Sequence, residues 1–297
     1  MGNARGAALM VASMAGFALE DMFIKLMGGA MPVGQILIGV GLGGALFFGT
    51  WAVLRGQPPL TAAMFRGASG LRALFEAVAS IGFVAALTLV PISVVTTIIQ
   101  ANPLLVTLGA ALFFGESVGW RRWTAIIVGL AGVLIVLRPF GTGFEAATLF
   151  AVMGVLAQTG RDLATRRISG TISTVQLSTL GFAVAIPAGI VALLGAGDPP
   201  VMPDLRTLGY LFGAIGIGIP SLYCIIAAMR IGDISFVAPF RYSRIIFGLL
   251  IGLWAFGERL DVFTLLGAAI IIASGLYTFA REARLRRRPS PLTSPAL

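Results

Sequence analysis

Apolar runs of about 20 residues recur along nearly the whole chain, separated by short segments that carry charged residues, proline or glycine. A helix needs about 20 apolar residues to cross the hydrocarbon core of a bilayer. The pattern therefore predicts an all-α integral membrane protein. We expect ten transmembrane helices, over residues 5–26, 34–54, 69–89, 92–115, 121–138, 145–166, 173–194, 206–229, 234–256 and 262–281.

The fourth and ninth expected helices resemble each other. Within Pro91–Glu116, a shift of 142 residues aligns Ile92–Glu116 with Ile234–Glu258, and both stretches are interrupted by proline and close on Gly-Glu. This indicates an internal duplication, with one repeat over residues 1–140 and a second over residues 141–281. Because each repeat has five helices, an odd number, the second repeat enters the membrane from the opposite side. Membrane transporters are often built from such inverted repeats.

Composition supports the membrane class and removes several kinds of chemistry. The chain is 58% hydrophobic and only 11% charged, where a soluble domain has roughly a quarter of its residues charged. It has no histidine and a single cysteine, Cys224, so we expect no disulfide framework, no metal site and no cofactor. An intramembrane enzyme is the alternative from another class. Only scattered Asp and Glu remain to serve it, so we expect no enzyme.

The net charge of +9 is explained by membrane topology rather than by nucleic acid. With the N-terminus inside, fifteen arginines fall in cytoplasmic segments, Arg72 and Arg161 among them, against four basic residues outside. Cytoplasmic loops of membrane proteins carry such an excess. We therefore expect both termini in the cytoplasm of a bacterium, with the protein in its inner membrane. The segment 282–297 is basic and then rich in Pro and Ser, and we expect it to be disordered.

The N-terminal apolar stretch is expected to be the first membrane helix rather than a cleaved signal peptide. Glu20, Asp21 and Lys25 interrupt it before any small-residue cleavage site. Its acid and base also have counterparts at Asp162 and Arg166 in the second repeat.

Two five-helix halves that each have a Gly-Glu after the penultimate helix resemble EamA-type members of the drug/metabolite transporter (DMT) superfamily. The motifs are Pro103 through Gly115-Glu116 and Ala238-Pro239-Phe240-Arg241-Tyr242 through Gly257-Glu258. The resemblance extends to about Arg281, and within the superfamily the chain is similar to YddG-type bacterial amino-acid exporters. It implies that helices one to four and six to nine surround a central cavity, with five and ten peripheral. The superfamily also includes carriers of riboflavin, S-adenosylmethionine, nucleotide sugars and lipophilic cations.

Arg241 and Arg244 are the first candidates for substrate binding. They lie three residues apart on one face of the ninth helix, and a charge there costs about 2.5–3.5 kcal/mol on insertion, so it should face a cavity or a partner. A guanidinium could bind a substrate carboxylate in bidentate fashion. The alternative is a structural ion pair with Glu76 or Asp162, which lie at comparable depth.

The fourth helix supplies further candidates at Gln100, Asn102 and Pro103. Proline removes a backbone hydrogen bond and frees a carbonyl group toward a cavity. We expect similar helix breaks at Pro220 and Pro239. The alternative is a packed kink in which Gln100 bonds to a neighbouring helix.

Glu20 and Asp21 lie in the outer third of the first helix and are candidate gate or proton-sensing carboxylates. The alternative, which we favour, is an interfacial pair with Lys25. Neither is expected to stand unpaired near the midplane, where a carrier of lipophilic cations would place a carboxylate. Aromatic side chains that could stack on a substrate are Tyr223, Tyr242, Phe17, Phe83 and Phe240.

These observations together predict a secondary transporter that works by alternating access and exports amino acids, aromatic ones among them. A carrier of drugs, nucleotide derivatives or vitamins from the same superfamily is the alternative. The expected partners are a small-molecule substrate and the lipid bilayer, with no nucleic acid. The sequence leaves the oligomeric state open, and a monomer is compatible with it.

Overall fold

The computed structural model describes residues 2–116, 119–139, 145–168 and 172–286, and within these ranges the chain forms helices and connecting turns with no strand. The helices are α1 (Gly2–Met27), α2 (Val33–Leu54), η1 (Ala62–Phe65), α3 (Gly67–Leu89), α4 (Ile92–Ile99), α5 (Asn102–Phe114), α6 (Trp120–Leu137), α7 (Thr148–Thr165), α8 (Thr174–Ala196), α9 (Leu205–Ile231), α10 (Ile234–Val237), η2 (Ala238–Tyr242), α11 (Ser243–Ala255) and α12 (Val262–Arg286).

The predicted all-α membrane fold is confirmed. Within the described ranges, eight helical segments are long and apolar enough to cross a membrane, α4 and α5 together counting as one. Two of the ten expected helices are not among these eight segments. The sixth, α7, is too polar because it carries Gln158, Arg161 and Asp162, and the ninth is divided into α10, η2 and α11. The number of spans and the repeat boundaries stay predictions. Helix α12 continues to Arg286, and residues 287–297 of the expected tail lie outside the described ranges.

Local sequence explains where the chain starts and interrupts its helices. Ser173 caps α8 through a reciprocal pair of bonds with Gln176, an arrangement that satisfies two otherwise free backbone donors. The fourth expected helix stops being α-helical at Gln100 and resumes at Asn102, with Pro103 in the first turn of α5, where a missing N–H costs least. Pro239 lies inside the 3₁₀ segment η2.

The two interrupted helices meet at their breaks. The side-chain amide of Gln100 donates a hydrogen bond of 2.7 Å to the main-chain carbonyl oxygen of Arg241 in η2. A carbonyl released by the irregular backbone of η2 thus finds a partner in the other break, as a membrane interior requires.

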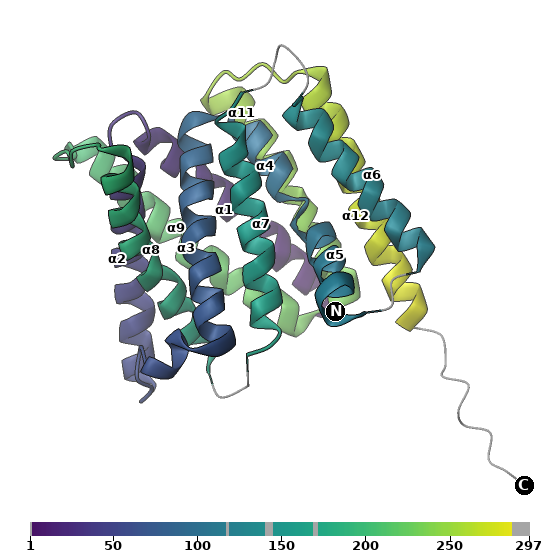
Figure 1. The fold of residues 1–297 in the computed structure, drawn as a ribbon, viewed down its shortest axis with the longest axis horizontal. Helices are drawn as coiled ribbons and strands as arrows, with labels where there is room; N and C mark the ends of the chain where they lie inside the picture. The colour runs from purple at the N-terminus through teal and green to yellow at the C-terminus, as the bar shows by residue number, and fades with distance from the viewer. Residues whose placement is uncertain (1, 117–118, 140–144, 169–171, 287–297) are drawn as a thin grey trace, which may run out of the picture.

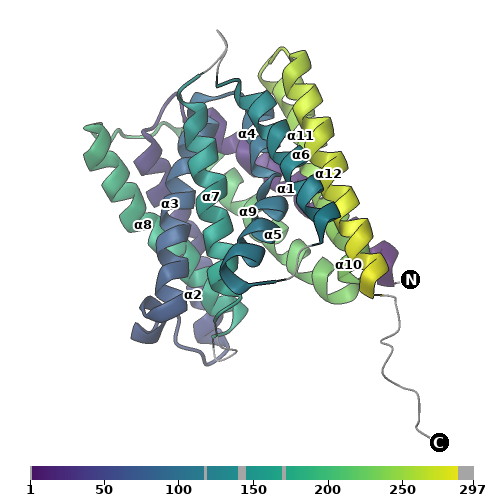
Figure 2. The same cartoon turned by 45° about the vertical axis from the view of Figure 1, so that its right-hand side comes forward.

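The most extensive helix contacts all join the first five expected helices to the last five. Helix α1 packs on α9, α3 on α7, α2 on α8 and α6 on α12. Figures 1 and 2 show α6 and α12 together at one side of the bundle, with α1 beginning and α12 ending toward the same end of the molecule. In the two repeats α1, α2, α3 and α6 correspond to α7, α8, α9 and α12. Replacing each helix by its counterpart turns the pair α1–α9 into α7–α3 and leaves α2–α8 and α6–α12 unchanged, as expected for a two-repeat fold.

One end of the bundle, here called the capped end, is closed. Glu258, after α11, accepts hydrogen bonds from the backbone N–H groups of Ile92 (2.6 Å) and Ser93 (3.1 Å) and from the Ser93 hydroxyl (2.7 Å), and so holds the start of α4. Lys25, at the end of α1, lies 4.0 Å from Glu258 and donates 2.6 Å to the carbonyl oxygen of Val90. A buried apolar cluster that includes Met27, Leu87 and Ile92 lies behind these contacts.

Candidate functional site

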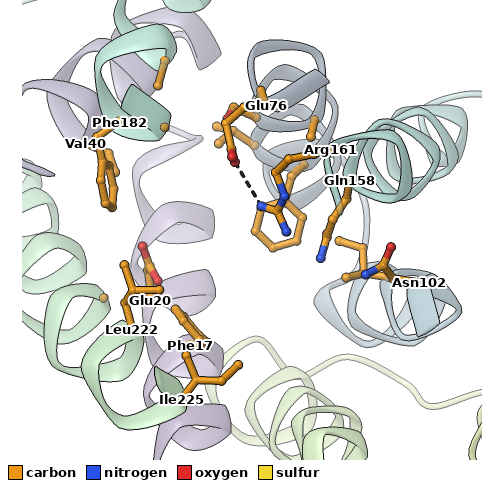
Figure 3. A pocket seen from close by; sticks show the side chains of 18 of the residues that line it. Phe17, Glu20, Val40, Glu76, Asn102, Gln158, Arg161, Phe182, Leu222 and Ile225 are labelled. Atoms are coloured by element: carbon orange, nitrogen blue, oxygen red, sulfur yellow. Dashed lines mark hydrogen bonds and ion pairs between the residues drawn. The ribbon is translucent and has the colours of Figure 1, made fainter. Parts of the chain in front are cut away.

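A cavity of about 380 Å³ lies between the helices and combines apolar walls with charged side chains. Its lining comes from α1, α2, α3, α4, α5, α7, α8, α9, η2 and α11, and the described residues of α6 and α12 do not contribute. This agrees with the arrangement that the family resemblance implies. Figure 3 shows Phe17, Val40, Phe182 and Leu222 around Glu20, opposite Arg161 and Gln158.

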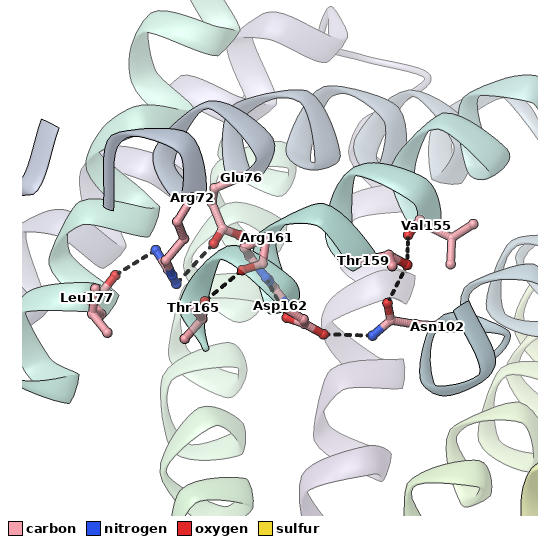
Figure 4. Close-up of polar contacts among 9 residues, drawn as sticks. All are labelled: Arg72, Glu76, Asn102, Val155, Thr159, Arg161, Asp162, Thr165 and Leu177. Carbon is pink, nitrogen blue, oxygen red and sulfur yellow. Dashed lines mark hydrogen bonds and ion pairs between the residues drawn. The ribbon is translucent and has the colours of Figure 1, made fainter. Parts of the chain in front are cut away.

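A chain of polar contacts runs along one wall of the cavity (Figure 4). Arg72 lies 3.2 Å from Glu76, and Arg161 donates a 3.0 Å bond to the other oxygen of Glu76. Arg161 also bonds Asp162 through Nε and Nη2, at 3.0 and 2.9 Å, and Asn102 donates to Asp162 at 2.8 Å. The network therefore ties α3, α7 and α5 together.

The direct ion-pair partner of Glu76 and Asp162 is neither Arg241 nor Arg244, although Asp162 lies close enough to Arg241 to act on its charge. Both carboxylates pair with Arg161, and neither is bonded to Arg241 or Arg244. Arg72 and Arg161 were counted as cytoplasmic, although they lie inside α3 and α7 and line the cavity. A sequence signal was available, because Arg72 stands four residues before Glu76 on the same helix face.

Gln158 is a further cavity residue that the sequence analysis missed. It lies on α7, three residues before Arg161, and therefore on the same face of that helix. Its side chain makes no hydrogen bond within the described ranges, so the amide is available to a solute.

Arg244 is held by Asp21, which is 1% exposed. Its guanidinium donates to both carboxylate oxygens, at 2.8 Å from Nη2 to each and 3.2 Å from Nε to one. The rings of Phe17 and Phe83 each lie 5.4 Å from the guanidinium carbon. The expected pairing of Asp21 with Lys25 was therefore wrong, because a cation from the other half occupies Asp21.

Two charged side chains in the cavity make no direct contact with an opposite charge in the described parts of the chain. Within the described ranges, Arg241 offers a carbonyl to Gln100 but makes no side-chain hydrogen bond or ion pair, and Glu20 makes none either. The Glu20 carboxylate lies against Gly218 of α9, where a Cβ would stand 2.6 Å from Oε1. Glu20 was expected to be an interfacial charge paired with Lys25, and the structure places it in the cavity instead.

The tyrosine candidates do not line the cavity. Tyr242 is 3% exposed and its ring packs edge-on against Phe279 of α12, at 6.3 Å between centroids. Tyr223 is 61% exposed and lies with Pro220 in a separate groove on α9. Sequence periodicity places these residues in membrane helices but cannot say which neighbour each one faces.

Of the helix-break prolines, one lines the cavity and another does not. Pro103 lines the cavity beside Asn102, whereas Pro239 lies inside η2 and is not among the lining residues. Among the other aromatic candidates, Phe17 and Phe83 line the cavity, and Phe240 packs against Phe236 outside it.

Comparison with known proteins identifies the family. The family described as "EamA-like transporter family" matches this chain twice, over residues 4–138 and 145–280. The chain belongs to the EamA-like transporter family. It is a multi-pass membrane protein with the two-repeat architecture of DMT-type transporters, and the relatives reported below are named as transporters.

Its curated relatives carry several different substrates. A riboflavin transporter of Rhizobium johnstonii is 29% identical over 74% of this chain and 72% of its own. An S-adenosylmethionine uptake transporter of Rickettsia bellii is 28% identical over 67% of each chain. The pseudopaline exporter CntI of Pseudomonas aeruginosa is 25% identical over 91% of this chain and 94% of its own. A crystal structure with 20% identity superposes with a TM-score of 0.59, covering 93% of this chain and 99% of that one, which shows the fold alone.

Proposed function

We propose that this EamA-like transporter carries zwitterionic metabolites of the amino-acid class. The observation that carries the proposal is a pair of opposite charges, Arg241 and Glu20, in one cavity with apolar and aromatic walls, neither of which makes a side-chain hydrogen bond or ion pair with a described residue. A guanidinium suits a carboxylate, which it can hold with two parallel hydrogen bonds. A carboxylate such as Glu20 suits an ammonium group, and Phe17 and Phe83 offer an apolar surface to a side chain.

The other arginines of the cavity support this assignment, because carboxylates of the protein already neutralise them. Arg244 is neutralised by Asp21, and Arg161 by Glu76 and Asp162. A solute that offered a single charge would leave either Arg241 or Glu20 without a direct ionic contact in a buried site, which is costly. A zwitterion satisfies both.

The second candidate is a nucleotide-derived or vitamin substrate, and the relatives named for S-adenosylmethionine and riboflavin favour it. S-adenosylmethionine contains an amino-acid group, so the same two charges would serve it. Competition between these compounds and labelled amino acids in one assay separates the two candidates.

For the transport cycle, we propose a secondary transporter of the bacterial inner membrane that works by alternating access, with both termini in the cytoplasm. The breaks at Gln100 and in η2 give the fourth and ninth expected helices places to bend, and broken helices mark the substrate path in many transporters. We propose that the protein exports amino acids from the cytoplasm. Because relatives are named for uptake and for export, flux is to be measured both ways.

The test is transport of labelled amino acids by proteoliposomes that hold the purified protein, beside Glu20→Gln and Arg241→Gln. A hydrogen bond to a charged group is worth about 1.5–3 kcal/mol, so each variant should weaken substrate binding by roughly 10–150-fold. Amino acids and their decarboxylated amines form matched probes. Arg241→Gln should abolish the preference for an amino acid over its decarboxylated amine, which lacks the carboxylate. Glu20→Gln should abolish the preference for an amino acid over its deaminated analogue, which lacks the ammonium group.

The matched controls are Arg206→Gln and Glu116→Gln, both at exposed positions outside the cavity, and both should transport as the parent does. Absence of flux or competition for every amino acid would refute the substrate class. Flux of S-adenosylmethionine or riboflavin under those conditions would select the second candidate.

A further inference from the structure

A second hollow, here called the arginine groove, lies on the outside of the bundle between α2, α8 and α9. Its volume is about 370 Å³, nearly that of the central cavity. Phe47, Phe48, Trp51, Ile219 and Tyr223 give it an apolar, aromatic lining, and no acidic residue belongs to the lining. The groove takes no part in the substrate site proposed above.

Both arginines of the groove lie at one end of it. Arg55 directly follows α2 and Arg230 lies in the last turn of α9, and both helices end at the pole of the bundle opposite the capped end. Arg55 stacks on Trp51 at 5.0 Å from the ring centroid. Neither guanidinium makes a hydrogen bond or an ion pair with any residue in the described parts of the chain.

The position of the groove in the membrane indicates which kind of ligand can bind in it. It faces outward from a bundle of membrane helices, so its apolar stretch lies among acyl chains, and arginine side chains near helix ends extend toward the headgroup level. Basic pockets between transmembrane helices attract anionic headgroups, at about 1 kcal/mol for each Lys or Arg near the surface. Two unpaired guanidiniums above an apolar slot therefore match a phosphate diester above an acyl chain.

We propose that the arginine groove is a binding site for one anionic phospholipid, with the headgroup phosphate between Arg55 and Arg230 and an acyl chain along Trp51 and Tyr223. Tyr223, which sequence analysis assigned to substrate, belongs to this site. Ser178 and Leu222 line both the groove and the central cavity, so a bound chain would lie against the wall of the cavity.

The test uses Trp51 as a reporter of the groove. Trp120, Trp123 and Trp254 are replaced by Phe, and the protein is reconstituted with phosphatidylcholine containing increasing fractions of brominated phosphatidylglycerol or brominated phosphatidylcholine. An acyl chain beside Trp51 quenches its fluorescence, and the concentration dependence gives the relative affinity of the two lipids. About 1 kcal/mol per arginine corresponds to about fivefold per arginine, so the anionic lipid should be preferred by roughly 25-fold.

In the same background, Arg55→Gln/Arg230→Gln should remove the preference, and Arg55→Lys/Arg230→Lys should retain most of it. The matched control is Arg121→Gln, because Arg121 also stacks on a tryptophan, Trp120 in the parent, but lies outside the groove. Water-soluble glycerophosphoglycerol is added in a separate arm and should not compete, because it lacks the chain.

Three results would overturn the proposal. Equal quenching by the two lipids would mean that only unselective boundary lipid contacts the groove. An anionic preference that survives the double Gln variant would place the site elsewhere. Full competition by glycerophosphoglycerol would make this an anion site without a lipid. The readout does not involve transport, so these outcomes are independent of the substrate assay.

Discussion

Arg241 and Arg244 look equivalent in the sequence, three residues apart on one helix, yet the structure gives them different surroundings. Arg244 is bonded to Asp21 and enclosed by two phenylalanine rings, whereas Arg241 lines the cavity and makes no direct ion pair with any described residue. The pattern of residues predicts that both arginines need a polar environment. Only the packing of α1 against α11 decides which of them is neutralised, and that packing is a long-range property.

The first prediction concerns the buried pair. Arg244→Gln should lower the free energy of unfolding by about 3–5 kcal/mol, because it leaves the Asp21 carboxylate buried and uncompensated. Denaturant unfolding in detergent micelles, followed by circular dichroism, measures the change. Adding Asp21→Asn should restore part of the loss, since the pair is then removed as a unit. An unchanged unfolding midpoint for Arg244→Gln would show that the pair contributes nothing.

At the scale of elements, the repeated Gly-Glu shows that a sequence repeat predicts the position of a residue but not its contacts. The sequence places a glutamate after the penultimate helix of each half, and the structure agrees. Their contacts differ, however. Glu258 holds two backbone N–H groups at the start of α4, whereas Glu116 pairs with Arg166 at a site where its side chain is 52% exposed. The difference depends on which loops meet at each end of the bundle.

This difference supplies the second prediction. Glu258→Gln should lower the free energy of unfolding by about 1–3 kcal/mol, since a neutral amide holds the N–H groups of Ile92 and Ser93 less well and also loses Lys25. Glu116→Gln is the matched control and should change it by at most about 1 kcal/mol, as for an exposed ion pair. Hydrogen exchange at the first amides of α4 should accelerate in Glu258→Gln alone. Equal effects of the two substitutions would contradict the capping role.

For the molecule as a whole, the sequence was enough to predict the helical membrane class and the breaks near Pro103 and Pro239, whereas the break expected at Pro220 was wrong, because α9 continues through that proline from Leu205 to Ile231. The sequence could not predict the cavity charges, because Arg72 and Arg161 look like loop residues when only the count of arginines is considered. Without these two, thirteen arginines still lie on the predicted cytoplasmic side against four basic residues on the other, so the predicted orientation is unchanged. Contacts between residues more than a hundred positions apart, such as Gln100 with Arg241, have no local signal.

The third prediction concerns access to the cavity. The capped end is closed, while the cavity reaches Leu177 in the first turn of α8 at the opposite end. In a Cys224→Ser background, a membrane-impermeant thiol reagent should label Gln158→Cys in inverted vesicles and much more slowly in intact cells. Val90→Cys, at a position 1% exposed near the capped end, should react slowly in both. Rapid labelling of Gln158→Cys in intact cells would mean that the cavity opens to the outside or that the proposed orientation is reversed.

The pairing of helices across the two halves has a consequence for how such a protein could arise. Since α1, α2, α3 and α6 each make their largest contacts with a helix of the other half, a half by itself would leave those contact faces uncovered. A gene that encoded a single half could have been useful only if its product assembled with a second copy inserted the other way up. Gene fusion would then have fixed the two orientations in one chain and allowed their charges to diverge. Asp21 and Arg244, one from each half, form a pair that requires two halves of different sequence, and a fused chain always holds both together.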